Sequence, residues 1–276
     1  MLRSAKEMEG YTVGATDGVI GDVKDFYLDD EKWVIRYLVV DTGGWLSSRK
    51  VLISPIAVGT PNWQQKLLPA LITKDQVRNS PEIDTETPVS RQHEMAYAGY
   101  YGFPYYWDGG GYWGSDVYPH MLMPGYGQAS GARTGANQRT AEIARRESER
   151  HAPDDPHLRS CNAIIGHHIH ASDGDIGHVA GMLIDEQTWA VRYLVIDTSN
   201  WWLGHQVLIA PQWTEAINWP DKTVTVSVTR QAVKHAPRYD PQAAMSRETE
   251  DQLYQHYGHA GYWTGYPISE DEIASN

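Results

Sequence analysis

The chain contains an internal duplication. Residues 10–107 align without a gap onto residues 166–263 at a constant offset of 156, with about 34 identities in 98 positions. The most similar stretch is Trp33 to Thr42 against Trp189 to Thr198. Solenoid repeats are about 20 to 45 residues long, so this much longer period excludes a solenoid and predicts two copies of a small domain.

Each copy is predicted to be mainly β. Asp17-Gly18 and Asp173-Gly174 separate short strand-like runs, and Asp-Gly is typical of a two-residue hairpin turn. The later strand over residues 33–41 is rich in β-branched and aromatic residues and is apolar on both faces. A strand that is covered on both sides within its own domain indicates a closed or strongly coiled small barrel.

The segments after the barrels have a different composition. Ser90 and Ser246 stand where N-caps would precede helices over residues 91–100 and 247–257. A stretch dominated by Gly, Tyr, Trp and Pro follows the first helix, and it cannot form a regular helix or a central strand. The predicted organisation is a first barrel at 1–81, a helix and Tyr/Gly/Trp-rich tail at 82–127, a hydrophilic linker at 128–160 that is helical over 140–150, a second barrel at 161–237, and a helix and C-terminal tail at 238–276.

Both copies carry Asp-Gly, Ile-Gly, Trp-x-(Ile/Val)-Arg-Tyr-Leu-Val-(Val/Ile)-Asp-Thr, a further Trp, and Val-Leu-Ile-x-Pro. This pattern resembles the PRC-barrel family, which includes the cytoplasmic part of the photosynthetic reaction-centre H subunit and half of a ribosome maturation factor. The resemblance implies two small, partly open barrels that contact other proteins and share no catalytic site. The chain lacks the membrane helix of the former and the basic balance expected of the latter, so it is most similar to soluble, often stress-linked bacterial members.

Charge and hydropathy restrict the partners. The chain has 35 acidic and 23 basic side chains, a formal net charge of −12, whereas binding to phosphates needs a basic face. We therefore expect no nucleic-acid partner. No apolar run approaches the roughly 18 residues of a membrane span, and the first residues lack the apolar core of a secretory signal. The single cysteine, Cys161, allows no intramolecular disulfide, so we expect a cytoplasmic protein.

A histidine cluster occurs in the second copy alone. His168 and His170 share one face of a predicted strand, and His178 is expected near the position that pairs with His170. Three imidazoles could converge there on a transition metal, so a metal site at these histidines is one hypothesis. The alternative is an exposed strand that happens to be rich in histidine.

No pattern indicates an enzyme or a bound cofactor. Cys161 lies in a linker six residues before His167, but nothing orients that histidine as a base or supplies an oxyanion site. The aspartates of the first hairpin lack the spacing of a calcium loop and are predicted to be a solvated edge. These are Asp22, Asp25, Asp29 and Asp30.

Several polar and turn residues are retained in both copies and are predicted to be structural. The central strand keeps an arginine, which could either position a partner or satisfy a carboxylate or loop carbonyls at the barrel rim, and we favour the second interpretation. The structural set is Asp17, Gly18, Trp33, Arg36, Asp41, Asp173, Gly174, Trp189, Arg192 and Asp197.

Tyrosine is concentrated in the tails, which contain twelve of the 17 Tyr. Tyr and Trp suit interfaces because they combine large contact area with a polar group. The tails could therefore bind a partner, or they could fold back over their own or the other barrel. The candidate interaction residues are Tyr100, Tyr101, Tyr105, Tyr106, Trp107, Tyr112, Trp113, Tyr257, Tyr262 and Trp263.

These patterns together predict a tandem PRC-barrel protein that is soluble, non-catalytic and without a cofactor. It would act as a scaffold or regulatory adaptor for a protein partner, in a stress response or elsewhere. The alternative is a peripheral component of photosynthetic electron and proton transfer, similar to the reaction-centre subunit and associated with a membrane surface. Two arrangements remain open: barrels packed about a pseudo-two-fold axis, or a homodimer.

Overall fold

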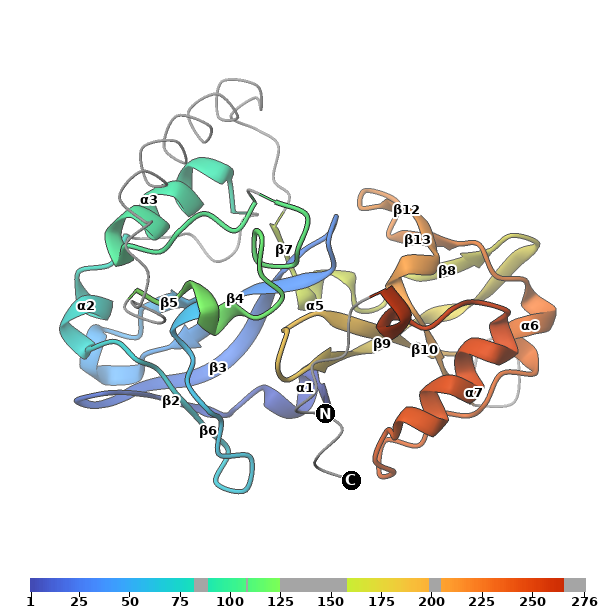
Figure 1. Cartoon of the computed structure of the whole chain (residues 1–276), viewed down its shortest axis with the longest axis horizontal. Helices are drawn as coiled ribbons and strands as arrows, with labels where there is room; N and C mark the ends of the chain where they lie inside the picture. The colour runs from blue at the N-terminus through green and yellow to red at the C-terminus, as the bar shows by residue number, and fades with distance from the viewer. Residues whose placement is uncertain (82–88, 108, 125–157, 199–204, 266–276) are drawn as a thin grey trace. The chain divides into compact units, whose positions relative to one another are not determined.

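The structure is a computed structural model that describes residues 1–81, 89–107, 109–124, 158–198 and 205–265 (Figure 1). It is mainly β, with two sheets and short helices, so the predicted fold class is confirmed. Neither sheet closes on itself in the described part of the chain. Two compact units are present: the first is Met1–Ile165 with Met182–Arg192, and the second is Gly166–Gly181 with Tyr193–Asn276.

The sheet of the first unit has the strand order β5-β4-β3-β2-β6, and β7 (Leu158–Ser160) pairs with β3 outside this path. Neighbours are antiparallel except for β6, which runs parallel to β2. The core side chains Val23, Phe26, Leu38 and Val40 are fully buried. The strands are β2 (Thr12–Ala15), β3 (Gly18–Asp29), β4 (Val34–Asp41), β5 (Lys50–Ile53) and β6 (Leu67–Pro69).

The predicted hairpin between β2 and β3 is present, but its turn is shifted by one residue. Ala15 pairs with Gly18, so the central residues are Thr16 and Asp17, not Asp17 and Gly18. Gly18 begins β3 with a φ of +143°, which side-chain-bearing residues rarely adopt. The Asp17 carboxylate instead accepts a hydrogen bond of 2.8 Å from the backbone N–H of Lys74, where helix α2 (Lys74–Arg78) begins.

The glycine of the Ile-Gly motif is required by a close approach of two strands. A Cβ added at Gly21 would lie 1.9 Å from the carbonyl oxygen of Asp41. In the second repeat, a Cβ at Gly177 would lie 2.1 Å from the carbonyl oxygen of Asp197. The absence of a side chain at each glycine therefore allows the backbones of two strands to come close at the same point of each repeat: β3 and the end of β4 in the first, and β9 and the end of the strand over residues 191–197 in the second.

The first strands of the two repeats are exchanged within the first unit. Strand β1 (Leu2–Ser4), from the first repeat, pairs with residues 183–185 of β9 (Gly174–Asp185) in the second repeat. Reciprocally, β7, from the second repeat, pairs with the last residues of β3. The sequences of β1 and β7 are both Leu-Arg-Ser and lie 156 residues apart.

A second reciprocal contact in the first unit joins the two tryptophans that stand at the same position of both repeats. The N–H of Ile35 donates to the carbonyl of Trp189, and the N–H of Val191 donates to the carbonyl of Trp33. Trp33 and Trp189 have φ values of +55° and +60°. They were predicted to begin the strands, but they lie in the turns before β4 and β10 (Val191–Asp197), where the chain takes a left-handed conformation.

The second unit repeats the β2–β3 arrangement. Strand β8 (His168–Ala171) forms a hairpin with β9 and runs parallel to β13 (Thr223–Val226). The Asp173 carboxylate accepts a hydrogen bond from the N–H of Arg230 at 2.7 Å, at the start of α6 (Arg230–Lys234), as Asp17 does at α2. The remaining strands are β11 (Gln206–Ile209) and β12 (Thr214–Asn218).

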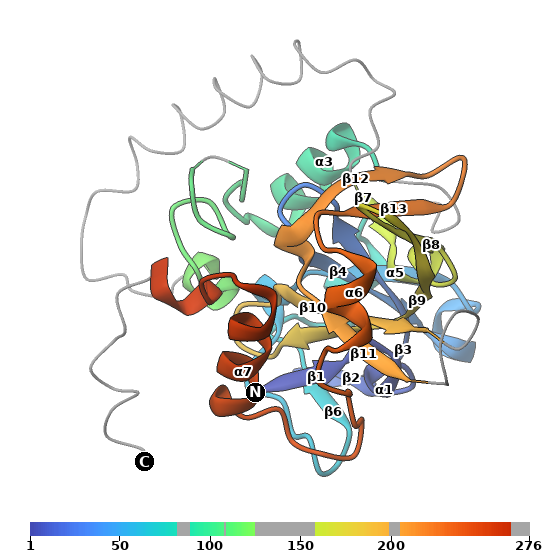
Figure 2. The same ribbon diagram turned by 90° about the vertical axis from the view of Figure 1, so that its right-hand side faces the viewer.

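Each repeat has the predicted helix after its sheet. In the first unit, α3 (Arg91–Tyr101) begins after Ser90 and ends at Gly102, with a φ of +70°. In the second unit, α7 (Arg247–Tyr257) begins after Ser246, whose hydroxyl accepts from the N–H of Thr249, and ends at Gly258 with a φ of +72°. Figure 2 shows α6 and α7 beside the sheet of the second unit.

Several sequence predictions fall outside the described residues. These are the linker helix over 140–150, most of the linker, Tyr126, Tyr266 and the last residues of the chain. The predicted domain boundaries stay predictions. Of the helices that the structure describes, none is both long and apolar enough to cross a membrane.

A candidate interaction site in the aromatic tail

A buried arginine anchors the first tail. Arg36 on β4 is 0% exposed and donates through Nε and Nη2 to Oδ2 of Asp29, at 3.1 and 2.7 Å. Asp29 ends β3, where its other oxygen accepts from the N–H groups of Glu31 and Lys32 and forms the turn. A buried guanidinium of this kind needs its carboxylate, because an unpaired charge in the core is strongly destabilising.

Arg192, the counterpart of Arg36, also lies in the first unit and makes the same pair. Its Nε and Nη2 donate to Oδ2 of Asp185 at 3.2 and 2.8 Å. Burial alone would raise the pKa of Asp185, but the adjacent Arg192 and two backbone N–H groups outweigh it and lower that pKa. The arginines therefore pair with Asp29 and Asp185.

Tyr112 connects the two arginines. Its carbonyl accepts a hydrogen bond from Nη1 of Arg36 at 2.5 Å, and its hydroxyl accepts one from Nη1 of Arg192 at 2.8 Å. The next residue, Trp113, is 0% exposed and donates from Nε1 to the carbonyl of Thr188 at 2.8 Å. The tail around residues 112–113 is therefore part of the packed interior of the first unit.

A contact set that we call the helix–tail clamp occurs in each repeat. In the first unit, the hydroxyl of Tyr106 donates to the buried carboxylate of Glu94, which also pairs with Arg91 at 3.0 Å. The Arg91 guanidinium lies 4.2 Å from the ring centroid of Trp107. These contacts bind the start of α3 to the chain that follows it.

The second unit forms the same clamp with the residues 156 positions later. The hydroxyl of Tyr262 donates to Glu250 at 2.9 Å, and Arg247 pairs with Glu250 at 2.9 Å. The Arg247 guanidinium lies 4.3 Å from the ring of Trp263. Glu250 also accepts from the hydroxyl of Tyr193 on β10, which fixes α7 to the sheet.

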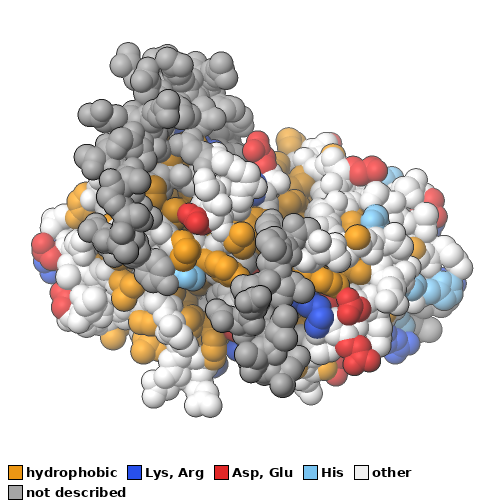
Figure 3. All heavy atoms as spheres, in the orientation of Figure 1, with side chains coloured by type: hydrophobic (Ala, Val, Ile, Leu, Met, Phe, Trp, Pro, Cys, Tyr) orange, Lys and Arg blue, Asp and Glu red, His pale blue; other side chains and the backbone are white. Residues whose placement is uncertain are grey.

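Part of the aromatic set stays accessible in the first unit. Tyr106 and Trp113 are buried, whereas Tyr101, Tyr105 and Trp107 are half-buried and Tyr100 is 41% exposed. Tyr105 stacks on Trp107 with ring centroids 4.6 Å apart. Figure 3 shows hydrophobic side chains gathered over the part of this unit that carries β4, β5 and η3 (Pro119–Leu122). The accessible aromatics thus contact one another, and Trp107 also packs against the buried Tyr106.

Tyr257, a candidate in the second tail, lies mostly against its own unit. Its ring packs 4.7 Å from that of Trp213, and burial raises the pKa of its hydroxyl. Tyr262 and Trp263 are half-buried through the clamp. The second tail therefore presents less free aromatic surface in the described residues than the first.

The predicted histidine arrangement is wrong in one respect. His168 pairs with His178 in the β8–β9 register, and His170 pairs with Asp175, because an irregularity between Ile169 and His170 shifts the register. Nδ1 of His170 lies 2.7 Å from the Asp175 carboxylate. Across the described residues, no group of three or more His, Cys, Asp or Glu side chains is placed to hold a metal ion. The metal hypothesis therefore gains no support from these contacts.

Cys161 does not lie in a linker. It is the first residue of α5 (Cys161–Ile164) and is buried, and this burial, with Asp25 and Glu9 nearby, raises the pKa of its thiol well above the usual range. A high pKa disfavours the thiolate that a nucleophile needs.

The prediction that the aspartates of the first hairpin form a solvated edge is wrong for two of them. Asp29 is buried, and Asp25 accepts hydrogen bonds from Ser160 and Asn162.

Sequence reasoning missed the carboxylates that organise the site. Asp29 and Asp185 are identical at the 156-residue offset, and so are Glu94 and Glu250. The comparison of the two copies could therefore have identified all four. Tyr112 has no counterpart in the aligned segment, and nothing in the sequence indicates its link between the two arginines.

The fold and this tail define a duplicated, mainly β protein with two sheets. Residues 2–62 match the family model described as PRC-barrel domain. This segment lies within the first repeat and spans β1 to β5. The match covers less than a quarter of the chain, so it characterises the first repeat.

A protein of Deinococcus radiodurans, described as uncharacterized, is also similar. It is 35% identical over 79 residues, which make up 29% of this chain and 28% of that protein. The chain therefore matches less than a third of the length of this relative.

Proposed function

We propose that the chain is a non-catalytic protein-interaction scaffold built from two PRC-barrel-type repeats. The family match at residues 2–62 supports this assignment for the first repeat. The second repeat has the same hairpin, the same Arg–Asp pair and the same helix–tail clamp at an offset of 156 residues. These shared features support a second domain of the same type.

The accessible aromatics of the first tail are the proposed contact surface. Tyr100 is exposed, and the stacked pair Tyr105 and Trp107 is half-buried. Aromatic side chains that are already held in place lose little conformational freedom on binding, so they contribute strongly to interfaces. This partly exposed aromatic set, packed against a buried neighbour, is the observation that carries the proposal.

The partner is a protein that buries apolar surface. Neither the family description nor that of the relative mentions photosynthesis or a stress response.

The test compares full-length variants in a pull-down from native lysate. The double substitution Tyr100→Ala and Trp107→Ala removes two of the three aromatic side chains of the contact surface and leaves the buried Tyr106 and Trp113 in place. Leu71→Ala is the matched control, because Leu71 is an exposed apolar residue outside the tail. A stoichiometric protein that is recovered with the wild type and the control, and lost with the double variant, supports the scaffold.

The same experiment can contradict the proposal. Recovery of the partner by the double variant would place the contact elsewhere, and recovery of no protein by the wild type would remove the reason to call the chain a scaffold. Circular dichroism and thermal unfolding of all three proteins show whether the variants remain folded.

A further inference from the structure

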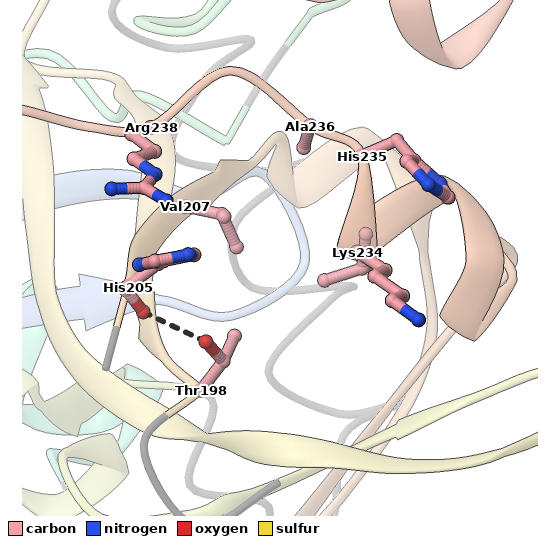
Figure 4. A pocket seen from close by; sticks show the side chains of 8 residues that line it. Thr198, His205, Val207, Lys234, His235, Ala236 and Arg238 are labelled. Carbon is pink, nitrogen blue, oxygen red and sulfur yellow. Dashed lines mark hydrogen bonds between the residues drawn. The ribbon is translucent and has the colours of Figure 1, made fainter. Parts of the chain in front are cut away.

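A pocket of about 280 Å³ lies in the second unit, beside the end of α6 (Figure 4). One wall comes from residues at the ends of β10 and β11, and the opposite wall comes from α6 and the chain that follows it. The volume is below the roughly 300 to 1,000 Å³ of sites for drug-sized ligands, so the pocket suits a small group. It is lined by Thr198, His205, Val207, Val233, Lys234, His235, Ala236 and Arg238.

The charged side chains of this lining are all of one sign. Lys234 and Arg238 are cations, and no acidic side chain is present among the lining residues. His205 and His235 become cations when they bind a proton. The chain as a whole has a net charge of −12, so this pocket concentrates positive charge in an acidic protein. Such a concentration in a hollow creates a local field that attracts anions.

Two lining positions are more positive than their counterparts in the first repeat. The residue 156 positions before Arg238 is Glu82, so the exposed Arg238 stands where the first repeat has a carboxylate. The counterpart of His235 is Asn79, so the second repeat gains a further group that can carry positive charge. The positive lining is therefore a property that the second repeat does not share with the first.

An ion pair of the first repeat is also absent at the matched positions of the second. Arg78 pairs with Asp75 at 2.9 Å at the end of α2. The counterparts of these residues on α6 are Lys234 and Gln231, so a neutral amide replaces the carboxylate. Positions 231, 235 and 238 thus all change towards positive charge in the second repeat.

His205 takes the position of a longer cation. Its counterpart is Arg49, whose guanidinium donates to the backbone carbonyls of residues 78, 80 and 81 at 3.2, 2.9 and 3.1 Å. The imidazole of His205 makes no hydrogen bond with the described part of the chain. Since an imidazole has an N–H donor in both its neutral and its protonated form, His205 can donate to a ligand.

Figure 4 shows which of these side chains can contact a common ligand. The guanidinium of Arg238 and the imidazole of His205 lie on the same side of the pocket. The side-chain nitrogens of Lys234 and His235 point away from His205. Direct hydrogen bonds to an anion would therefore come from Arg238 and His205, and the other two side chains would add positive potential at longer range.

We propose that this pocket binds a phosphate monoester group, with the Arg238 guanidinium and the His205 imidazole as hydrogen-bond donors. A phosphate monoester carries about −1.5 to −2 charge at pH 7 and has three strong acceptor oxygens, so it can bind donors from two side chains at once. A carboxylate carries one charge and fits the planar fork of a single guanidinium. The presence of several cationic groups around one pocket therefore favours phosphate.

The phosphate group can belong to a free phosphorylated small molecule or to a phosphorylated side chain of a partner protein, because both present the same oxygens. The site lies in the second unit and uses none of the aromatic residues that support the scaffold function. Either proposal can therefore fail alone.

The experiment titrates the full-length protein, at low ionic strength, with inorganic phosphate, glycerol 3-phosphate and a capped peptide that contains one phosphoserine. Calorimetry gives the stoichiometry, and the imidazole NMR signals of His205 locate the site. L-Glutamate and L-arginine are the comparison probes. We expect saturable binding of one equivalent of each phosphate probe, a shift of the His205 signals, and about tenfold weaker binding of glutamate, because a carboxylate carries less charge.

The order of affinities identifies the source of the phosphate group. Tighter binding of the phosphopeptide than of the two free phosphates indicates a partner protein. Tighter binding of the free phosphates than of the phosphopeptide indicates a small-molecule ligand. Both orders support the site.

Arg238→Glu restores the residue of the first repeat and should weaken phosphate binding about tenfold or more, because it removes charge-assisted donors and adds repulsion. Lys222→Glu is the matched control: it makes the same charge change at an exposed residue of the same unit that does not line the pocket. It should alter binding by less than about threefold, because salt screens distant surface charges. Thermal unfolding shows whether each variant is folded, and His205→Ala, which should weaken binding about threefold or more, tests the site even if Arg238→Glu does not fold.

Three results would overturn the proposal. The first is no binding of any phosphate probe. The second is binding of glutamate or arginine that is as tight as the binding of phosphate, which would mean that the pocket does not select this group. The third is binding that Arg238→Glu leaves unchanged, or that Lys222→Glu weakens equally, which would make the attraction a general effect of charge.

Discussion

Within the first unit, the hydroxyl of Tyr112 accepts a hydrogen bond of 2.8 Å from Nη1 of Arg192. The carbonyl of the same residue accepts from Arg36, the arginine that stands 156 positions earlier. One tail residue therefore satisfies the equivalent arginines of both repeats. It follows that a deletion of the first tail would remove part of the fold together with any partner surface, so point variants are the appropriate test of function.

Tyr112→Phe should destabilise the protein by about 1 to 2 kcal/mol, because Arg192 loses an acceptor while the carbonyl contact to Arg36 remains. The free energy of unfolding in urea measures this loss. Tyr118→Phe is the matched control in the same tail: its ring stacks on His120, and the change should alter stability by less than about 0.5 kcal/mol. Equal effects of the two substitutions would show that the Tyr112 hydroxyl has no special role.

Arg36→Met should cost about 3 to 5 kcal/mol, because the buried carboxylate of Asp29 loses its guanidinium. The ring of Tyr106, 3.8 Å from the guanidinium, also loses its cation contact. The control is Arg78→Met, which breaks an exposed pair with Asp75 and should change the free energy of unfolding by less than about 1 kcal/mol. A small loss for Arg36→Met would mean that Asp29 is satisfied without Arg36.

The sequence predicts the secondary structure of each repeat well, because the identities at the 156-residue offset concentrate on strand and cap residues such as Leu38, Val39 and Ser90. It does not predict the exchange of β1 and β7. A run of three residues indicates a strand, but its pairing partner depends on long-range packing, and the two Leu-Arg-Ser segments are identical.

The site was predicted less completely than the fold. The pattern identified Arg36 and Arg192 as structural candidates, but the partner carboxylates Asp29 and Asp185 were assigned to a solvated edge or left out. Charged residues at a strand end are usually exposed, but Asp29 is buried where β3 pairs with β4 and β7 and Arg36 binds its carboxylate. Tyr112 lies in an irregular segment, where neither periodicity nor the internal repeat restricts its contacts.

His167 should make the stability depend on pH. It is buried, and burial together with Lys222 and His168 lowers its pKa. The unfolded chain therefore binds a proton at this residue more readily than the folded chain, so stability falls as the pH drops below about 6.5. His167→Tyr introduces the residue that the first repeat has at this position, Tyr11. The substitution should remove the loss of stability at low pH that is due to His167.

The measurement for His167→Tyr is the difference in unfolding free energy from the wild type at pH 7.5 and at pH 5.5. We expect the variant to gain relative to the wild type at the lower pH. His235→Tyr, which changes an exposed histidine of the same unit that is not among the causes of the lowered pKa of His167, is the control and should not alter the pH dependence in this way. A constant difference for His167→Tyr across this range would contradict the argument.

Asp25 should lower stability as the pH rises, which is opposite to the effect of His167. Burial raises its pKa above the usual value, against the hydrogen bonds from Ser160, Phe26 and Asn162. The folded state then holds a proton more readily than the unfolded state, so this residue costs stability as the pH rises from about 4 through the raised pKa. Above that pKa, the penalty of the buried carboxylate is constant.

Asp25→Asn removes the penalty and keeps the local hydrogen bonds, because an amide can accept from the N–H of Phe26 and donate to the hydroxyl of Ser160. The variant should therefore be more stable than the wild type at pH 7, and this advantage should shrink towards pH 4. Asp22→Asn, an exposed change on the same strand, should shift the unfolding free energy by less than about 0.5 kcal/mol at both pH values. If Asp25→Asn is instead less stable at pH 7, the ionised carboxylate is needed to hold β7 and α5 on β3.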